Sequence, residues 1–364
     1  MAAEFICPDG RKARRVCAMM ENYPLSIELS ELRQPLADMA CTPIARETGH
    51  DYLNIPSKKI ENDGTILARD ALPLPLICGG AVAKNLIIAV PHGGRCYPEG
   101  WFTPANYPRA RSLEDTGTDI LGLMLARAHR PGLIAQIGRG VVDLNRPEEA
   151  IDSQLCPDIT QKASSVYKPY IAAGYGVIPR LSAMREPIYD TPFSQKQTED
   201  ILASFHRPYH RILREKLEEM LAENDHILLI DLHSMPDPNR QFQSKKQIAR
   251  QRGLPDFIFG NLHGATLPAN LATAIDEVMH HRGENSTGFS WGWNAPYAGG
   301  YTTRFYGLEY HKQTDKRLSV LQIEVNRTLY LDKHNRLDGT ALMTIARLLD
   351  RLMTRLEDAL DRTG

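Results

Sequence analysis

Two histidines stand just after short apolar runs of the sequence, where they could bind a metal ion or act as bases. His92 follows residues 86–90, and His233 follows residues 226–230. Apolar runs of five residues are typical of strands that are buried on both faces. In open α/β sheets, ligands bind just past the carboxyl ends of the strands. A single histidine at such a place is as often bonded to a backbone carbonyl, so the functional interpretation rests on the arrangement occurring twice.

Carboxylates complete the set of side chains that a hydrolytic metal site needs. A third predicted strand, residues 318–323, ends at Glu324, and the pair Glu114 and Asp115 precedes a predicted helix. Two imidazoles and one carboxylate, with one position left open, form the ligand set of a hydrolytic zinc site. A separate carboxylate must then take a proton from water and return it to a leaving amine. These residues come from four segments, so their spacing predicts such a site but does not fix the ligands.

Two arginines could hold the carboxylate of a substrate. Arg146 follows a predicted strand, and a guanidinium there could bind a carboxylate through two hydrogen bonds. The alternative is a structural ion pair with Asp143 or a nearby glutamate. Arg304 lies in a stretch rich in glycine and aromatic residues, 294–307, which indicates a long functional loop. Thr303 in the same stretch could donate a hydrogen bond, although threonines in such loops more often serve packing.

The composition is that of a soluble globular protein. The chain has 364 residues, of which 42% are hydrophobic and 24% charged, with a formal net charge of -1. It is long enough to bury a large core, and no basic excess indicates a nucleic-acid partner. No apolar segment approaches the roughly 18 to 20 residues that cross a bilayer, and the N-terminus has no signal-peptide pattern. Six scattered cysteines without a CxxC pattern favour reduced thiols, and hence a cytoplasmic protein.

Strands that alternate with helices must position the candidate residues. Helical periodicity predicts helices over residues 119–128, 194–223, 267–280 and 339–362, with Ser194 able to cap the second. Strands are expected at residues 86–90, 133–137, 141–142, 226–230, 256–260 and 318–323. This alternation predicts an α/β fold whose central sheet, parallel or mixed, is flanked by helices. Residues 1–84 are punctuated by prolines and are expected to form an N-terminal extension that packs on a catalytic domain at 85–364, or a small separate domain.

Two other kinds of enzyme are disfavoured by missing motifs. The sequence has no G-x-S-x-G, which the nucleophile of many serine hydrolases requires. It also has no G-x-G-x-x-G after a strand and no P-loop lysine, so nucleotide binding is not favoured.

Taken together, nine short segments resemble the N-formylglutamate amidohydrolase family, in the family's order. They are residues 90–94, 114–117, 142–147, 176–180, 208–210, 231–236, 255–264, 299–307 and 321–324. Each segment is weakly specific alone, and the ordered set is considerably more so. The match covers roughly residues 85–335 and leaves the N-terminal 84 residues unassigned. The resemblance implies a phosphorylase/hydrolase-like fold, similar to that of the zinc carboxypeptidases, with a mixed sheet between helices.

The resemblance also implies a zinc site. His92 and His233 would be ligands, with Asp115 as the third and Glu114 as the alternative to it. A carboxypeptidase would offer a glutamate three residues after the first histidine, but Arg95 stands there in this chain. The acidic ligand must therefore come from elsewhere. Another divalent ion could replace zinc, because nitrogen and oxygen ligands accept several.

Roles for the other residues follow from the same resemblance. Glu324 corresponds to the general base, and Arg139 is expected to stabilise the oxyanion of the tetrahedral intermediate. Arg146 and Asn145, with Arg304, would hold the carboxylate of the substrate.

The resulting hypothesis is a zinc-dependent hydrolase of a linear amide bond. It would remove an N-formyl or other N-acyl group from a carboxylate-bearing amino acid such as N-formyl-glutamate, a deformylation that belongs to amino-acid catabolism. The alternatives are a deacylase or carboxypeptidase-like peptidase of the same fold, and a non-catalytic binding protein. The expected partner is a small N-acyl amino acid, with no nucleic acid and no membrane; the sequence predicts no oligomeric state.

Overall fold

The computed structural model describes residues 41–42, 75–78, 84–98, 101–160, 163–236, 254–280, 288–314, 316–332 and 335–362. Residues 41–42 and 76–78 form the two outermost strands on one side of the sheet. The rest of the predicted N-terminal extension, up to residue 83, lies outside the described residues, so the predicted domain division stays a prediction. Among the helices that are described, none is both long enough and apolar enough to cross a membrane.

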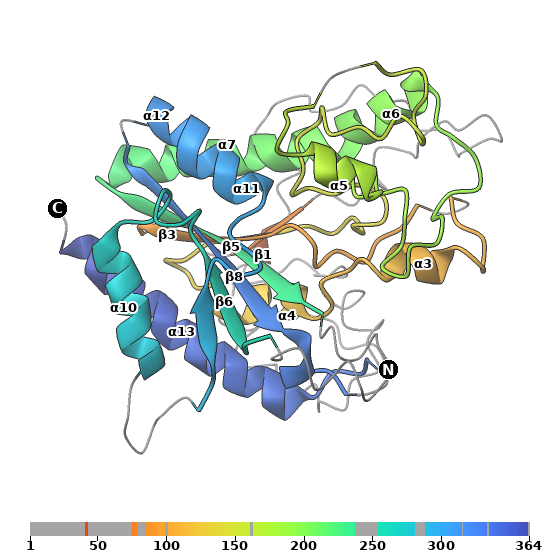
Figure 1. Ribbon diagram of the computed structural model, residues 1–364. Coiled ribbons are helices and arrows are strands. Elements are labelled where there is room, and N and C mark those ends of the chain that lie inside the picture. The colour runs from red at the N-terminus through yellow and green to blue at the C-terminus, as the bar shows by residue number, and fades with distance from the viewer. Residues whose placement is uncertain are drawn as a thin grey trace.

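A mixed sheet lies between two layers of helices (Figure 1). Its eight strands in the described part of the chain are β1 (Cys41–Thr42), β2 (Leu76–Cys78), β3 (Leu86–Val90), β4 (Gly132–Ile134), β5 (Ile227–Met235), β6 (Phe257–Gly260), β7 (Trp291–Trp293) and β8 (Leu318–Asn326). Their order in the sheet is β1-β2-β4-β3-β5-β8-β6-β7. The four central strands, β4, β3, β5 and β8, are parallel, and β2 and β6 run antiparallel to their inner neighbours. The predicted α/β fold with a mixed central sheet is confirmed.

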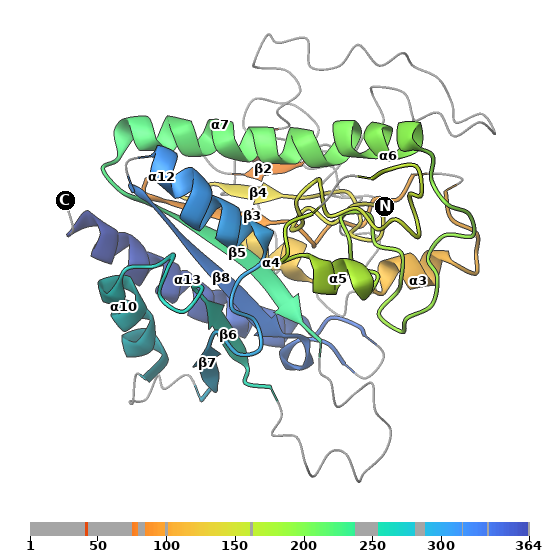
Figure 2. The ribbon, with the colours of Figure 1, turned by 45° about the horizontal axis from the view of Figure 1, so that its top comes forward.

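Helices cover both faces of this sheet. They are α3 (Tyr107–Arg111), α4 (Thr118–Leu125), α5 (Lys168–Ala172), α6 (Gln195–Ile201), α7 (Arg207–Glu223), α10 (Ala269–His280), α11 (Tyr301–Arg304), α12 (His311–Gln313) and α13 (Gly339–Asp361), with π-helical turns at Leu202–His206 and Phe305–Tyr310 and a 3-10 turn at Arg327–Leu329. Figure 2 shows α6 and α7 running along one face of the sheet, with α10 and α13 on the other.

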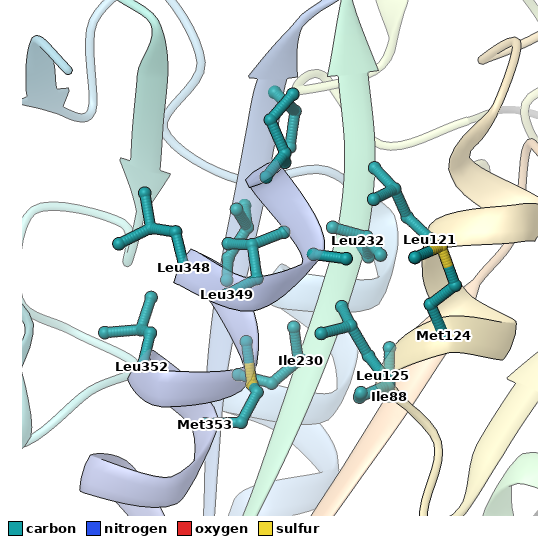
Figure 3. Close-up of a cluster of buried hydrophobic side chains, with 14 of the residues drawn as sticks. Ile88, Leu121, Met124, Leu125, Ile230, Leu232, Leu348, Leu349, Leu352 and Met353 are labelled. Carbon is teal, nitrogen blue, oxygen red and sulfur yellow. The ribbon is translucent and has the colours of Figure 1, made fainter. Parts of the chain in front are cut away.

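The central strands are buried on both faces, and alternate residues belong to two separate cores. On one face, Ile88 and Ile230 pack with residues of α4 and α13, as Figure 3 shows. On the other face, Ile87 and Leu229 belong to the core that includes α7. Burial on both sides explains why these strands are almost continuous apolar runs in the sequence.

The strands β5 and β8 are longer than their apolar runs predict. They pair in parallel along all nine residues of each strand, and His233 lies directly opposite Glu324. The sequence predicts that both strands end where polar residues begin. The ladder continues because these polar side chains are buried against one another rather than facing water, so polarity does not mark the strand end here.

Other predicted elements differ locally from the structure. Residues 141–142 belong to no strand, and β4 ends at Ile134; the two valines are apolar because they fill a core, not because they form a strand. The predicted loop at 294–307 becomes helical from Tyr301 onward. The predicted helix at 194–223 is continuous but contains a π-helical turn just before Pro208, which has no N–H to donate. Ser194 caps it as predicted.

A buried arginine joins α13 to the turn between α4 and β4. Arg130, 1% exposed, donates from Nε and Nη2 to the two carboxylate oxygens of Glu357, both at 2.7 Å. Its Nη1 donates to Asp350 at 2.7 Å and to the carbonyl of Leu125 at 3.2 Å. Burying a charge is costly unless it is paired and hydrogen-bonded. Arg130 and Glu357 can therefore stay buried as charged groups only as long as they are paired with each other.

Replacing Arg130 by methionine should lower the free energy of unfolding by about 3–5 kcal/mol, because Glu357 would stay buried without its main counter-ion. Urea denaturation followed by circular dichroism measures this. The matched control is Arg355→Met, which removes an exposed ion pair between α13 and Glu277 and should cost about 1 kcal/mol or less. Equal losses in the two variants would contradict the role given to Arg130.

Candidate metal centre

The site lies where one face of the sheet changes from apolar to polar. Because side chains alternate along a strand, the residues of β5 at 227, 229, 231 and 233 share a face, as do those of β8 at 318, 320, 322 and 324. The first two of each strand are apolar and belong to the core with α7. The last two are Asp231 and His233 in β5, and Gln322 and Glu324 in β8, all buried. The polar cluster therefore begins where that core ends.

His92, Asp115 and His233 are brought together from three segments. His92 follows β3, Asp115 precedes α4, and His233 lies in β5. The Nδ1 atoms of the two histidines lie 3.5 Å and 3.0 Å from Oδ2 of Asp115. One ligand atom from each residue lies within 4.8 Å of the others, and this is the one such group of metal-ligand side chains in the described part of the chain. Two imidazoles and a carboxylate fit a hydrolytic zinc site.

A second carboxylate binds the far nitrogen of each histidine. Nε2 of His92 lies 2.7 Å from Oδ1 of Asp143, and Nε2 of His233 lies 2.9 Å from Oδ1 of Asp231. With a metal ion at the Nδ1 atoms, each of these carboxylates would accept the N–H of Nε2, which leaves the lone pair of Nδ1 for the ion. Histidines that bind metals are commonly held by carboxylates in this way. Both lone pairs then point toward the same oxygen of Asp115.

The nitrogen of His92 that faces the cluster has no hydrogen-bond partner. Its Nδ1 is buried and unsatisfied, although a buried polar atom normally finds a partner. A cation among the three side chains would supply that partner. The observed donor set therefore fits a divalent metal ion.

Charges within the cluster shift the pKa values of its members. Burial acts to raise the pKa of Asp115, but its contacts with His233 and His92 and the charge of Arg327 outweigh burial and hold that pKa well below its usual range. Burial acts to lower the pKa of His233, but the carboxylates of Asp231 and Asp115 raise it well above the ordinary value. The cluster thus provides a concentration of negative charge that stabilises a cation.

The alternative ligand, Glu114, points to other partners. Its Oε1 accepts hydrogen bonds from Tyr97 at 2.8 Å and from Nε of Arg111 at 2.9 Å, and its Oε2 accepts from Nη2 of Arg111 at 3.2 Å. It is not part of the group formed with His92. The geometry favours Asp115 over Glu114.

Glu324 lies on the strand next to His233 and is held by Gln322. The amide of Gln322 donates to Oε1 of Glu324 at 2.8 Å, and its own oxygen accepts from the backbone N–H of Gly300 at 2.7 Å. Burial raises the pKa of Glu324 to about 7, with the charges of Asp115 and Asp231 adding to the effect and those of His233 and Arg139 opposing it. A carboxylate with such a pKa can both take and return a proton near neutral pH.

Arg139 lies beside the cluster and is fixed by Asp143. Its Nε and Nη2 bind Oδ2 of Asp143 at 3.0 Å and 2.9 Å, and its Nη1 lies 3.9 Å from Oδ1 of Asp115. Its side chain is partly exposed. A positive charge is thus held at the edge of the candidate site.

Arg146 is buried without a carboxylate partner in the described residues. Its guanidinium donates to the carbonyls of Asn145 at 2.9 Å and Tyr175 at 3.2 Å, and lies 4.2 Å from the ring centre of Tyr170. The alternative of a structural ion pair with Asp143 is not formed. Burial lowers the pKa of Arg146, which reflects a desolvated charge. Such a charge favours an incoming anion.

The other predicted substrate residues lie at different distances from the cluster. The amide of Asn145 lies 2.9 Å from Nε2 of His233 and 3.3 Å from Oδ2 of Asp231, and its oxygen accepts from the N–H of Thr302 at 2.7 Å. The hydroxyl of Thr303 lies 3.4 Å from Oδ2 of Asp231. Arg304, on α11, is half-buried and has no ion pair in the described part of the chain.

Several residues of the site escape the sequence analysis. Nη2 of Arg327 binds Oδ1 of Asp115 at 2.7 Å, and no pattern in the sequence indicates this contact. No role is predicted from the sequence for two other histidines, which are buried on the helical segment around Pro208. His206 and His210 bond through Nε2 to the carbonyls of Arg146 and Leu144, at 2.8 Å and 2.9 Å. They hold the segment that carries Asn145 and Arg146.

Comparison with known proteins identifies relatives of the whole region that forms the site. Residues 84–331 match the family model for N-formylglutamate amidohydrolase. The N-formylglutamate deformylase of Pseudomonas putida is 28% identical over 252 residues, covering 68% of this chain and 82% of that protein. The N-formylglutamate deformylase of Pseudomonas aeruginosa is 29% identical over 256 residues, with the same coverage.

Solved structures show a similar fold. The crystal structure of N-formylglutamate amidohydrolase from Ralstonia eutropha JMP134 aligns with a TM-score of 0.67 and 25% identity, covering 80% of this chain and 100% of that chain. A gene product of Agrobacterium tumefaciens aligns with a TM-score of 0.54 and 13% identity, covering 79% of this chain and 96% of that chain, which is a similarity of fold alone.

Replacing Asp115 by asparagine should abolish binding of a divalent ion, whereas Glu114→Gln should retain it, because the carboxylate of Glu114 faces Arg111 and Tyr97. Elemental analysis after dialysis against zinc measures the stoichiometry, which we expect to be one ion per chain in the wild type and in Glu114→Gln. Circular dichroism checks that both variants are folded. Loss of zinc from Glu114→Gln with retention by Asp115→Asn would reverse the assignment.

Proposed function

Because this chain belongs to the N-formylglutamate amidohydrolase family, we propose that it hydrolyses the amide bond of an N-acylated amino acid, with N-formyl-glutamate as its substrate. One observation carries the proposal: two carboxylate-bound histidines direct their Nδ1 atoms at Asp115, next to a buried glutamate on the neighbouring strand. These are the ligands and the proton-transfer group that hydrolysis of an amide needs. The names of the relatives support the choice of substrate.

We propose that His92, Asp115 and His233 hold a zinc ion. When bound, zinc polarises the amide carbonyl and makes a water molecule acidic enough to attack it near neutral pH. The proposed ligand set leaves a coordination position open, as catalytic zinc sites do.

Glu324 is the proposed general base and acid. It takes a proton from the attacking water, whose oxygen bonds to the acyl carbon, and then gives a proton to the nitrogen as the C–N bond breaks. For an N-formyl substrate the products are formate and the free amino acid. Its raised pKa suits both transfers, and the hydrogen bond from Gln322 fixes one oxygen so that the other is free for the proton.

Two arginines are proposed to act on charges of the substrate. Arg139 stabilises the negative charge that develops on the carbonyl oxygen, because Asp143 holds its guanidinium at the edge of the cluster. Arg146 binds a carboxylate of the amino acid, because it is buried with only carbonyl and aromatic partners. Asn145, Thr303 and Arg304 are proposed to line the same side of the substrate.

Glu324→Gln should retain zinc and lose about 10²- to 10⁴-fold in kcat, because the amide cannot accept the proton. Formate release from N-formyl-L-glutamate measures this, with chelated and zinc-restored samples alongside. In the zinc-loaded wild type, kcat/KM should rise with pH to a plateau that begins at or below about 7, since only the deprotonated carboxylate is a base and its pKa without the metal is raised to about 7. Bound zinc would shift the rising part of the pH profile to lower pH, because the positive ion favours the ionised carboxylate of Glu324.

The same assay separates the alternatives. A zinc-loaded protein that releases no formate but cleaves another N-acyl amino acid would keep the reaction and change the substrate. A protein that binds zinc and cleaves no member of an N-acyl amino-acid panel would refute the proposed activity. Substantial turnover by Glu324→Gln would refute the role of Glu324.

Arg146→Met should raise KM and lower kcat/KM for N-formyl-L-glutamate roughly 10- to 100-fold, since a hydrogen bond to a charged group contributes about 1.5–3 kcal/mol. Zinc content should not change. Steady-state kinetics at saturating zinc measure the effect. An unchanged KM would exclude a carboxylate contact at this position.

A further inference from the structure

Arg327 is a charged residue that binds a proposed metal ligand and that the mechanism above does not use. It follows β8 directly and begins the 3-10 turn Arg327–Leu329. Its Nη2 donates to Oδ1 of Asp115 at 2.7 Å, and its side chain is largely buried. Its Nε donates to the hydroxyl of Ser234 at 2.8 Å, and Nη2 also lies 3.3 Å from the carbonyl of Ser234.

We propose that Arg327 is a positioning residue that presents Asp115 to the metal through Oδ2 alone. The inference rests on the proposed function, because it assumes that Asp115 is a ligand. It assigns a role in metal binding to a residue that lies outside the ligand set.

The two oxygens of Asp115 have separate partners. Oδ2 faces Nδ1 of His233 at 3.0 Å and Nδ1 of His92 at 3.5 Å, and accepts from the N–H of Ser234 at 3.2 Å. Oδ1 accepts from Nη2 of Arg327 at 2.7 Å and lies 3.9 Å from Nη1 of Arg139. A carboxylate whose second oxygen is held by a guanidinium cannot turn to give both oxygens to a metal. One oxygen per carboxylate keeps a coordination position open for water or substrate.

The turn that carries Arg327 is itself fixed to the segment that carries Asp115. The side chain of Asn326 caps the turn by accepting from the N–H of Thr328. The hydroxyl of Tyr330 donates to the carbonyl of Thr116 at 2.9 Å. Gly117 has a φ of 91°, and a side chain there would meet the ring of Tyr330. The two segments are therefore held together at Asp115 and again at the next two residues.

A guanidinium suits this position better than an ammonium. Arg327 uses Nε for Ser234 and Nη2 for Asp115, so that a planar fork joins the ends of β5 and β8 to the ligand. A lysine ammonium is a single point charge, so it could form a well-placed hydrogen bond with Ser234 or with Asp115 but not with both. The side chains that hold ligands in place typically affect metal affinity or activity by 10- to 100-fold.

The test compares metal binding by Arg327→Met, Arg327→Lys and wild type, using the full chain stripped of metal. The dissociation constant for Zn²⁺ is measured by competition with a chromogenic chelator, and coordination is followed by the visible absorption of the Co²⁺-loaded protein. We expect Arg327→Met to bind Zn²⁺ 10- to 100-fold more weakly with an altered Co²⁺ spectrum, and Arg327→Lys to fall between it and wild type. Arg336→Met, which removes an exposed ion pair with Asp332, should match wild type.

Wild-type Zn²⁺ affinity and Co²⁺ spectrum in folded Arg327→Met would overturn the inference while leaving the proposed function intact. If Arg327→Met does not fold, Arg327→Lys decides, and wild-type affinity and spectrum in that variant would overturn it equally. Failure of the wild type itself to bind Zn²⁺ would overturn the proposed function, and the inference with it.

Discussion

The position of the site depends on the in-register pairing of β5 with β8 over nine residues. Side chains alternate along each strand, so this register sets His233 beside Glu324 and, two residues earlier, Asp231 beside Gln322. A slip of either strand by one residue would turn its two polar side chains toward the opposite face, where α4 and α13 form an apolar core. The large cores on both faces therefore fix the register, and through it the chemistry. Stability and function share one structural cause here.

The charged residues around the candidate metal position are arranged in two layers. Nearest the candidate metal position are Asp115 and the Nδ1 atoms of two histidines; behind them stand Asp143 and Asp231. Arg139 and Arg327 neutralise part of this negative charge from outside. Without these arginines the carboxylates would repel one another at short range in a buried setting. The outer charges thus allow the inner ones to be ionised and correctly directed.

Much of this could be predicted from sequence, and the failures have physical reasons. His92 and His233 can be picked out from the sequence because each follows an apolar run. The ends of β5 and β8 cannot be predicted in this way, because the buried polar residues that continue these strands resemble the start of a loop. The sequence also does not distinguish Asp115 from Glu114 as the metal ligand, since the distinction depends on which of the two carboxylates Arg111 and Tyr97 bind. Arg327 contacts Asp115 across 212 residues of sequence, a distance that local patterns do not span.

The anchoring of residues 143–146 has a consequence for how this protein can change over evolution. The imidazoles of His206 and His210 hold that segment by its backbone carbonyls, whereas the side chains of Asp143 and Asn145 contact His92 and His233. A bond to a carbonyl does not depend on which side chain the residue carries. The bond from His206 to the carbonyl of residue 146 would therefore persist if another side chain replaced the guanidinium. If Arg146 binds the substrate as we propose, substrate preference can diverge at this position while His206 and His210 still hold the segment that supports the two proposed histidine ligands.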